Sequence, residues 1–193
     1  IDLCCRILND ASDVDRYNVS KTVRKAKRKI QKTKGPDWRP ATSQDLEESP
    51  LKDMYFAAIG IAPGEFYAGL KPLGDAMELL WPYINKSNHE VKLLSAPIPI
   101  RRSYNDNEAA TVMTSEDGKS QWVEKFLKPL PSEIIITPAR DKKEYAVSDE
   151  APNILIDDRE KNINQWRELG GIGILHVTGD SKSTITSLKH IGA

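Results

Sequence analysis

Two adjacent aspartates, Asp157 and Asp158, follow the short apolar run Ile154–Ile156. Neighbouring carboxylates repel each other, so the pair points to a cation close by. The alternative is a polar strand end that begins a turn, because Arg159 and Glu160 come next. These residues alone leave both interpretations open.

Other groups that could handle phosphate also lie in or after apolar runs. Asp2 and Cys4 lie in the first run, Ser95 follows "VKLL", and Arg140–Lys143 follow "IIIT". Functional residues of an open α/β sheet gather at the carboxyl ends of its strands, so these groups are predicted to converge with the aspartate pair. A hydroxyl, a lysine and several carboxylates suit Mg²⁺-assisted phosphoryl transfer, in which the ion and the lysine balance phosphate charge and an aspartate attacks phosphorus.

The predicted strands and helices that must position these groups alternate along the chain. Apolar residues at helical spacing predict helices over 73–84, 119–130 and 161–171. Short apolar runs predict buried strands at Ile1–Leu8 in part, Val91–Leu94, Ile134–Thr137, Ile154–Ile156 and Gly173–Val177. This alternation predicts an α/β protein with a doubly wound parallel sheet.

Residues 11–67 interrupt the alternation. Eight lysines and arginines fall within 21–34, and prolines and acidic residues follow them. This segment is predicted to be an inserted, mainly helical unit. Residues 1–10 and 68–193 are then left to form the core.

In their order, these segments resemble the haloacid dehalogenase superfamily of phosphohydrolases, and within it the 5′(3′)-deoxyribonucleotidases with their phage and bacterial relatives. The resemblance covers roughly residues 54–178. Its motifs are "APGEFYAGLKPLGDAMELL" (62–80), "LLSAP" (93–97), "SQWVEKFL" (120–127), "IIITPARDK" (134–142) and "ILIDDR" (154–159). It implies a Rossmann-like three-layer α/β/α fold with a helical cap over 11–67. It also implies Mg²⁺-dependent hydrolysis of nucleoside monophosphates through an aspartyl-phosphate.

The first motif departs from the family pattern. The family has Asp-x-Asp-Gly, and this chain has "DLCC" at residues 2–5. The resemblance makes Asp2 the nucleophile and places Cys4 where a second aspartate acts as general acid and base. A thiol, with an ordinary pKa near ~8.5, is a poor substitute. The chain is therefore expected to be a phosphatase, active or weakened, or an inactive relative.

The resemblance assigns the remaining roles. Ser95 would bind phosphate, and Lys142, favoured over Lys143 by the "RDK" likeness, would be the catalytic lysine. The implied Mg²⁺ ligands are Asp2, Cys4 through its backbone carbonyl, Asp157 and Asp158. The implied substrate contacts are Phe66, Ala96 and Arg159, although Phe66 could equally pack between cap and core and Arg159 could form a surface ion pair.

The composition of the chain bears on its binding partners and on its location in the cell. The chain has 193 residues with 28 Lys and Arg against 28 Asp and Glu, so no net charge favours nucleic acid or a membrane surface. No apolar run approaches the ~20 residues of a membrane helix. The only cysteines, Cys4 and Cys5, are adjacent, which disfavours a disulfide and favours a cytoplasmic location.

Three functions therefore stay open. The first is a nucleotidase with a small nucleotide as its substrate and Mg²⁺ as its cofactor, and a homodimer is left open. The second is a protein that kept the fold as a binding or structural module. The third uses the basic stretch 21–34 to bind nucleic acid or to dephosphorylate a polynucleotide end, although such a run is more often a solvated helix face.

Overall fold

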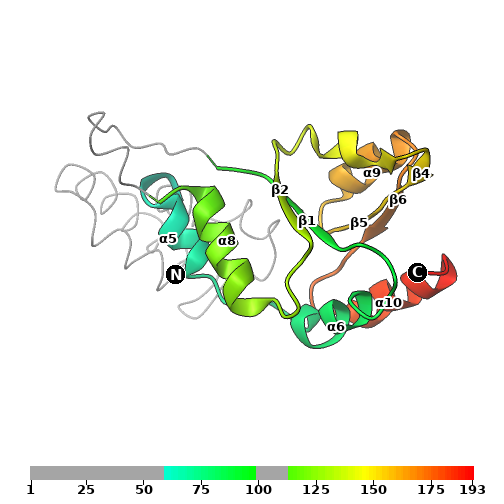
Figure 1. The fold of residues 1–193 in the computed structure, drawn as a ribbon, viewed down its shortest axis with the longest axis horizontal. Helices are drawn as coiled ribbons and strands as arrows, with labels where there is room; N and C mark the ends of the chain where they lie inside the picture. The colour runs from blue at the N-terminus through cyan, green and yellow to red at the C-terminus, as the bar shows by residue number, and fades with distance from the viewer. Residues whose placement is uncertain (1–58, 99–112) are drawn as a thin grey trace, which may run out of the picture. The chain divides into compact units, whose positions relative to one another are not determined.

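The computed structural model describes residues 59–98 and 113–193 (Figure 1). These residues divide into two compact units. Residues 59–70, 98 and 113–122 belong to the first unit, and residues 71–97 and 123–193 belong to the second. The predicted strand at Ile1–Leu8 and most of the predicted cap lie outside the described residues.

The second unit is built on two pairs of parallel strands. Strand β1 (Lys92–Ser95) pairs with β2 (Glu133–Ile136), and β5 (Ile154–Asp157) pairs with β6 (Ile172–Leu175). A mixed α/β fold with parallel strands is therefore confirmed. The predicted strand bounds were one residue early for β1, and one to two residues late for β2 and β6. An antiparallel hairpin of β3 (Val147–Ser148) and β4 (Ala151–Pro152) was not predicted.

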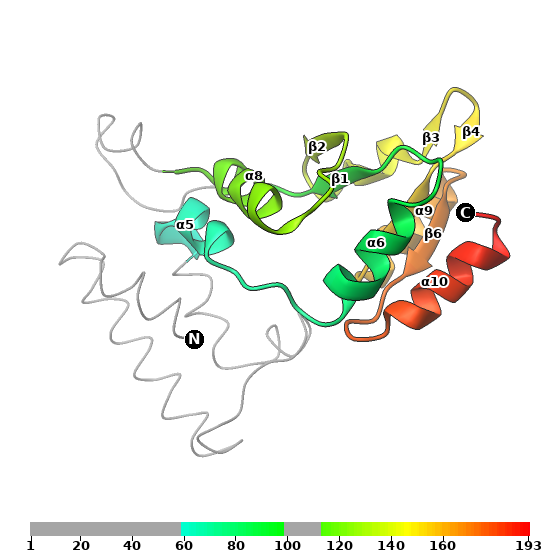
Figure 2. The same cartoon turned by 60° about the horizontal axis from the view of Figure 1, so that its bottom comes forward.

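Helices cover both faces of the β5–β6 pair (Figure 1 and Figure 2). On one face, Leu155 of β5 packs with Ile163 and Trp166 of α9 (Glu160–Glu168). On the other, Ile174 of β6 packs with Leu188 of α10 (Ser181–His190) and with the helical segment before β1. That segment is the π-helical turn η1 (Ala76–Leu80) followed by α6 (Trp81–Ile84). The pair thus has helix, sheet and helix layers, because alternate residues of each strand point to opposite faces.

The outer edge of β6 is closed by a side chain. The carbonyls of Asn153 and Asp157 accept hydrogen bonds from the amides of Ile172 and His176, which fixes the backbone direction of each residue in the pair. Gly173 therefore points its carbonyl away from β5, and the guanidinium of Arg167 donates to it at 2.6 and 3.2 Å. Such a contact blunts an edge strand.

The edge of β1 that faces away from β2 and the edge of β5 that faces away from β6 are called the inner edges, and they differ from the edge of β6 that Arg167 contacts. By the same alternation, Ile154 and Ile156 direct their backbone groups away from β6, and Leu94 of β1 directs its groups away from β2. Among the described residues, neither β1 nor β5 has a second strand partner. The Leu94 side chain nevertheless packs against the cluster that holds Leu155.

The helix predicted at 119–130 actually runs earlier, as α8 (Ser115–Phe126). Its start is a capping box. The amide of Asp117 donates to the Thr114 hydroxyl at 3.1 Å, and the amide of Thr114 donates to the Asp117 carboxylate at 3.2 Å. Its end precedes Pro129, which has no amide hydrogen and disfavours helix in the residue before it. Helix α9 likewise ends three residues before the predicted bound, at Glu168.

In the first unit, helix α5 (Pro63–Ala68) meets α8 through two glycines. A Cβ placed on Gly118 would collide with the backbone of Gly64. We expect Gly118→Ala to destabilise the protein by about 1–3 kcal/mol through overpacking, measured by chemical denaturation. Gln121→Ala, at an exposed position of the same helix, is the control. Equal stability of the two variants would contradict the close approach of the helices.

Helix α10 was not predicted, because its sequence is mostly polar. Two carboxylates hold its start. Asp180 accepts from the amide of Ser183 at 3.2 Å, and Asp75, before η1, accepts from the hydroxyl of Ser181 at 2.6 Å and from its amide at 3.3 Å. Asp75 therefore ties α10 to η1 across 106 residues of sequence.

These contacts make the stability of the protein depend on whether the Asp75 carboxyl group is ionised. The Ser181 hydroxyl, its amide and the nearby His176 hold the pKa of Asp75 below its ordinary value of 3.8. Its stabilising effect is therefore fully present above pH 3.8 and is lost as the pH falls through the lowered pKa. We expect Asp75→Asn to reduce the free energy of unfolding at pH 7 and to have little effect in strong acid. Glu78→Gln, at an exposed carboxylate nearby, is the control; a pH-independent loss for Asp75→Asn would contradict this account.

Candidate active site

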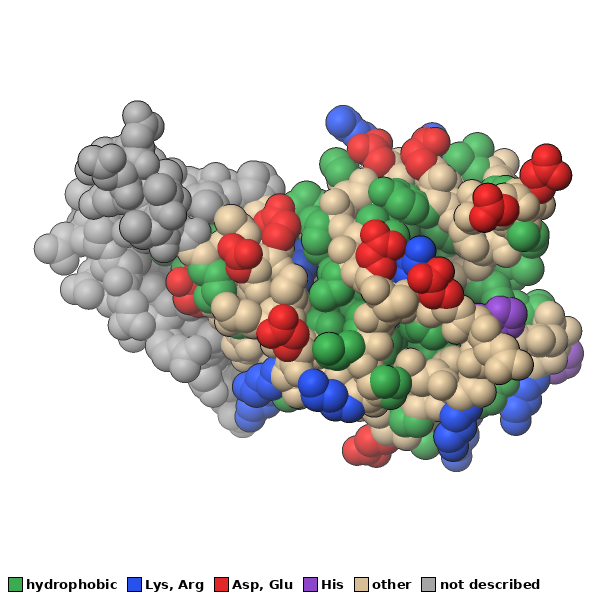
Figure 3. All heavy atoms as spheres, viewed as in Figure 1, with side chains coloured by type: hydrophobic (Ala, Val, Ile, Leu, Met, Phe, Trp, Pro, Cys, Tyr) green, Lys and Arg blue, Asp and Glu red, His purple; other side chains and the backbone are tan. Residues whose placement is uncertain are grey.

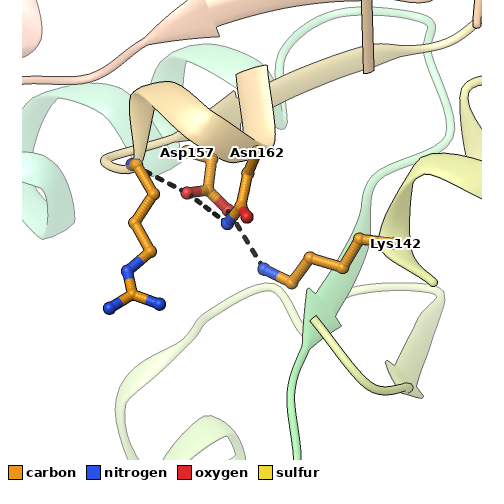
Figure 4. A network of polar contacts seen from close by, with 4 residues as sticks. Lys142, Asp157 and Asn162 are labelled. Atoms are coloured by element: carbon orange, nitrogen blue, oxygen red, sulfur yellow. Dashed lines mark hydrogen bonds and ion pairs between the residues drawn. The ribbon is translucent and has the colours of Figure 1, made fainter. Parts of the chain in front are cut away.

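A buried ion pair lies at the carboxyl end of β5. The ammonium Nζ of Lys142 lies 3.0 Å from Oδ2 of Asp157 (Figure 4), and the two side chains are only 12% and 9% exposed. Asn162 donates from Nδ2 to both oxygens of the same carboxylate, at 2.9 and 3.0 Å. The cation expected beside Asp157 is thus supplied by a lysine of the chain itself.

Local turns bring these three side chains together. After β2, the amide of Asp141 donates to the carbonyl of Pro138, and a 3₁₀ turn, η2 (Lys142–Tyr145), begins with Lys142. After β5, the amide of Arg159 donates to Oδ1 of Asp157 at 2.8 Å. This Asx turn redirects the chain into α9, whose first turn carries Asn162.

Three donor groups contact the Asp157 carboxylate, and together they reach both of its oxygens. Oδ1 accepts from Arg159 and Asn162, and Oδ2 accepts from Lys142 and Asn162. An ionised carboxylate offers about four lone-pair sites. Good geometry and additional hydrogen bonds are what a nearly buried ion pair needs to offset its desolvation.

Ser95 lies at the carboxyl end of β1, as Asp157 lies at the carboxyl end of β5. It is the last residue of β1 and is paired with Ile136 of β2, and its backbone carbonyl accepts from the amide of Thr137 at 2.9 Å. Lys142 lies in the turn that follows β2, and its ammonium contacts the carboxyl end of β5. Ser95 and Ala96 are both half-buried there.

The structure places Lys142, not its neighbour Lys143, against Asp157. Asp158 and Arg159 lie on the exposed side of the turn before α9, and each makes further contacts. In the space-filling view, acidic and basic side chains lie close together on one face of the second unit (Figure 3).

Phe66 belongs to the first unit, where it is buried and its ring meets Tyr67 edge-on at 5.4 Å. Its role in binding a base stays a prediction. Asp2 and Cys4 lie outside the described residues, so their predicted roles stay predictions as well.

Asn162 was not among the site residues predicted from the sequence. An asparagine in the first turn of a helix is common, because its side chain can satisfy free amides there. The available signal was its spacing of five residues from Asp157. That spacing lets a first-turn side chain reach back over the turn to the end of the preceding strand, as Figure 4 shows.

The predicted Mg²⁺ set fits the described residues only in part. Within residues 59–98 and 113–193, no three His, Cys, Asp or Glu side chains are grouped as metal ligands. Carboxylate oxygens are the ligands that Mg²⁺ prefers. The carboxylate of Asp157, however, would have to release Lys142 or Asn162 to bind one. Of the two aspartates, Asp158 is the more exposed candidate.

Comparisons with models of protein families, with curated proteins and with solved structures gave no match. Among the helices that the structure describes, none has the length and apolar character needed to cross a membrane. The function must therefore be argued from the chain's own residues.

Proposed function

We propose that the chain is a Mg²⁺-dependent phosphatase of the haloacid dehalogenase type that acts on nucleoside monophosphates. The observation that supports this most directly is the Lys142–Asp157 ion pair. It joins the two segments that resemble the family's third and fourth motifs, at the carboxyl ends of parallel strands. An ammonium held in a nearly dry site can balance the charge that develops on a transferred phosphoryl group.

The open inner edges of β1 and β5 support the same proposal. Among the described residues, β1 and β5 each have one strand partner, so each could accept the first-motif strand that the resemblance implies.

In this site each group has one task. Asp2 would attack phosphorus, Ser95 would donate to a phosphate oxygen, and Lys142 would stabilise the negative charge. Mg²⁺, when bound, would neutralise phosphate oxygens and orient the phosphate. Asp158 would be its ligand together with Asp2 and the backbone carbonyl of Cys4.

The test is phosphate release from a panel of 2′-deoxyribonucleoside 5′- and 3′-monophosphates in MgCl₂. Release that EDTA abolishes, and that Lys142→Met lowers, would support the proposal. Release no faster from the wild type than from Lys142→Met would overturn it.

A second candidate is a protein that binds a phosphorylated ligand without hydrolysing it. Cys4 in place of the acid and base, and an Asp157 carboxylate that already contacts Lys142 and Asn162, favour this alternative. Isothermal titration with the same nucleotides separates the two, since binding without phosphate release is expected only from the second. The basic stretch 21–34 lies outside the described residues, and a salt-dependent gel shift would test nucleic-acid binding.

A further inference from the structure

Asn162 has no part in the proposed chemistry, yet it spans the central carboxylate of the site. Its Nδ2 lies 2.9 Å from Oδ1 and 3.0 Å from Oδ2 of Asp157 (Figure 4). We propose that Asn162 is a positioning residue: its amide fixes the Asp157 carboxylate in the orientation that holds the Lys142 ammonium in the site. The catalytic consequence rests on the proposed function, but the positioning itself does not.

Rotation of the carboxylate is the motion that Asn162 restricts. The terminal torsion of an aspartate is broad and has no sharp staggered minima. An amide that contacts both oxygens limits this rotation, and the Arg159 amide restrains only Oδ1. Lysine carries its charge on a flexible four-carbon stem, so the place of its ammonium follows the place of its partner. Oδ2, which Lys142 contacts, also accepts from Asn162 at 3.0 Å.

Burial strengthens this restraint. Asn162 is 9% exposed, in the first turn of α9 between Asp157 and the hydrophobic cluster of Ile163 and Trp166. A buried amide needs hydrogen-bond partners, because water cannot replace them at low cost. Asn162 and Asp157 therefore satisfy each other, and neither side chain can turn away without leaving a polar group unpaired.

The simpler alternative is that Asn162 only stabilises the start of α9. The Asx turn at Arg159 and the first-turn position of Asn162 are compatible with such a role. The two roles predict different behaviour of Lys142. A helix-start residue affects the stability of the protein but leaves the Lys142 ammonium where it is, whereas a positioning residue also controls the exposure of that ammonium.

The experiment compares Asn162→Leu, similar in size but without a donor, with Ile163→Val on the same turn of α9. Hydrogen exchange of the Lys142 ammonium is measured by NMR on the full chain with ¹⁵N-labelled lysine, and Lys142→Arg assigns the signal. In Asn162→Leu we expect exchange about 10-fold faster or more, as loss of a hydrogen bond to a charged group implies. Phosphate release is expected to show kcat lower by about 10- to 100-fold with KM changed far less. Ile163→Val should change neither.

Unchanged exchange of the Lys142 ammonium in a folded Asn162→Leu protein would overturn the inference. If that variant does not fold, Asn162→Ser, whose shorter side chain cannot span both oxygens, takes its place. If the wild type releases no phosphate, the proposed function fails, but the exchange measurement still decides whether Asn162 positions Lys142.

Discussion

Replacing Lys142 by methionine is expected to lower phosphate release by about 10²–10³-fold, the loss typical when a preorganised donor is removed from a developing negative charge. Methionine is similar in length and cannot carry charge, so the site keeps its volume and loses only its cation. The measurement is kcat with a deoxyribonucleoside monophosphate in MgCl₂. Lys143→Met is the matched control, because it removes the same charge one residue along η2.

The same variant is expected to lose stability. It leaves the nearly buried Asp157 carboxylate without its cation, and breaking a buried pair costs up to about 3–5 kcal/mol. The Asn162 and Arg159 donors remain, so the lower part of that range is expected. Lys143→Met should be close to the wild type in chemical denaturation.

A double variant separates the effect of Lys142 on phosphate release from its effect on the stability of the protein. Lys142→Met with Asp157→Leu replaces both ions by apolar groups, an exchange that is often neutral or stabilising. We expect it to recover stability relative to Lys142→Met and to remain inactive. Recovery of phosphate release together with stability would show that Lys142 only holds the fold, and would contradict its role in the site.

The strands were the part of the fold that the sequence predicted well. Buried parallel strands appear as short apolar runs, and β1, β2, β5 and β6 all do so. The β3–β4 hairpin has only two residues in each strand, too short for any periodicity to show. Helix bounds were less accurate, because they depend on individual side-chain contacts such as the capping box of Thr114 and Asp117.

Helix α10 shows a second limit. Its inward face consists of Ser181, Thr184, Leu188 and the partly buried Ile185, and serine and threonine do not stand out as apolar. What holds its start, the Asp75–Ser181 contact, joins residues 106 positions apart. No local pattern could have indicated that contact, and it becomes visible only once η1 and α10 are packed on the same face of the sheet.

Some residues of the candidate site could likewise be predicted from the sequence, and others could not. The position of Asp157 at a strand end, and of a lysine after another strand, could be predicted, because parallel strands bring their carboxyl ends to one edge. The choice of Lys142 over Lys143 depended on family resemblance, and the structure supplies a physical reason in the turn at Pro138–Asp141. The contribution of Asn162 could not be predicted, because it depends on how the first turn of α9 is oriented toward the end of β5.

The second large effect concerns the first motif. Cys4 lies outside the described residues, and its role follows from the resemblance and from the proposed function. A nucleotidase with cysteine at this position keeps its nucleophile, Asp2. It lacks the carboxyl group that protonates the leaving oxygen and later activates water. General acid–base catalysis contributes about 10²–10⁴-fold in rate.

Cys4→Asp combined with Cys5→Gly is therefore expected to raise Mg²⁺-dependent phosphate release by about 10²–10⁴-fold, or about 3–5 kcal/mol of activation free energy. The glycine is included because the family motif has one there, and a larger side chain could crowd the new aspartate. The measurement is kcat on deoxyribonucleoside monophosphates, wild type against the double variant, with Asp2→Asn in the double-variant background as the control. A folded double variant that binds Mg²⁺ and releases phosphate no faster than this control would rule out a nucleotidase weakened at its first motif. A ligand-binding role built around Lys142 and Asp157 would then be the better account of the site.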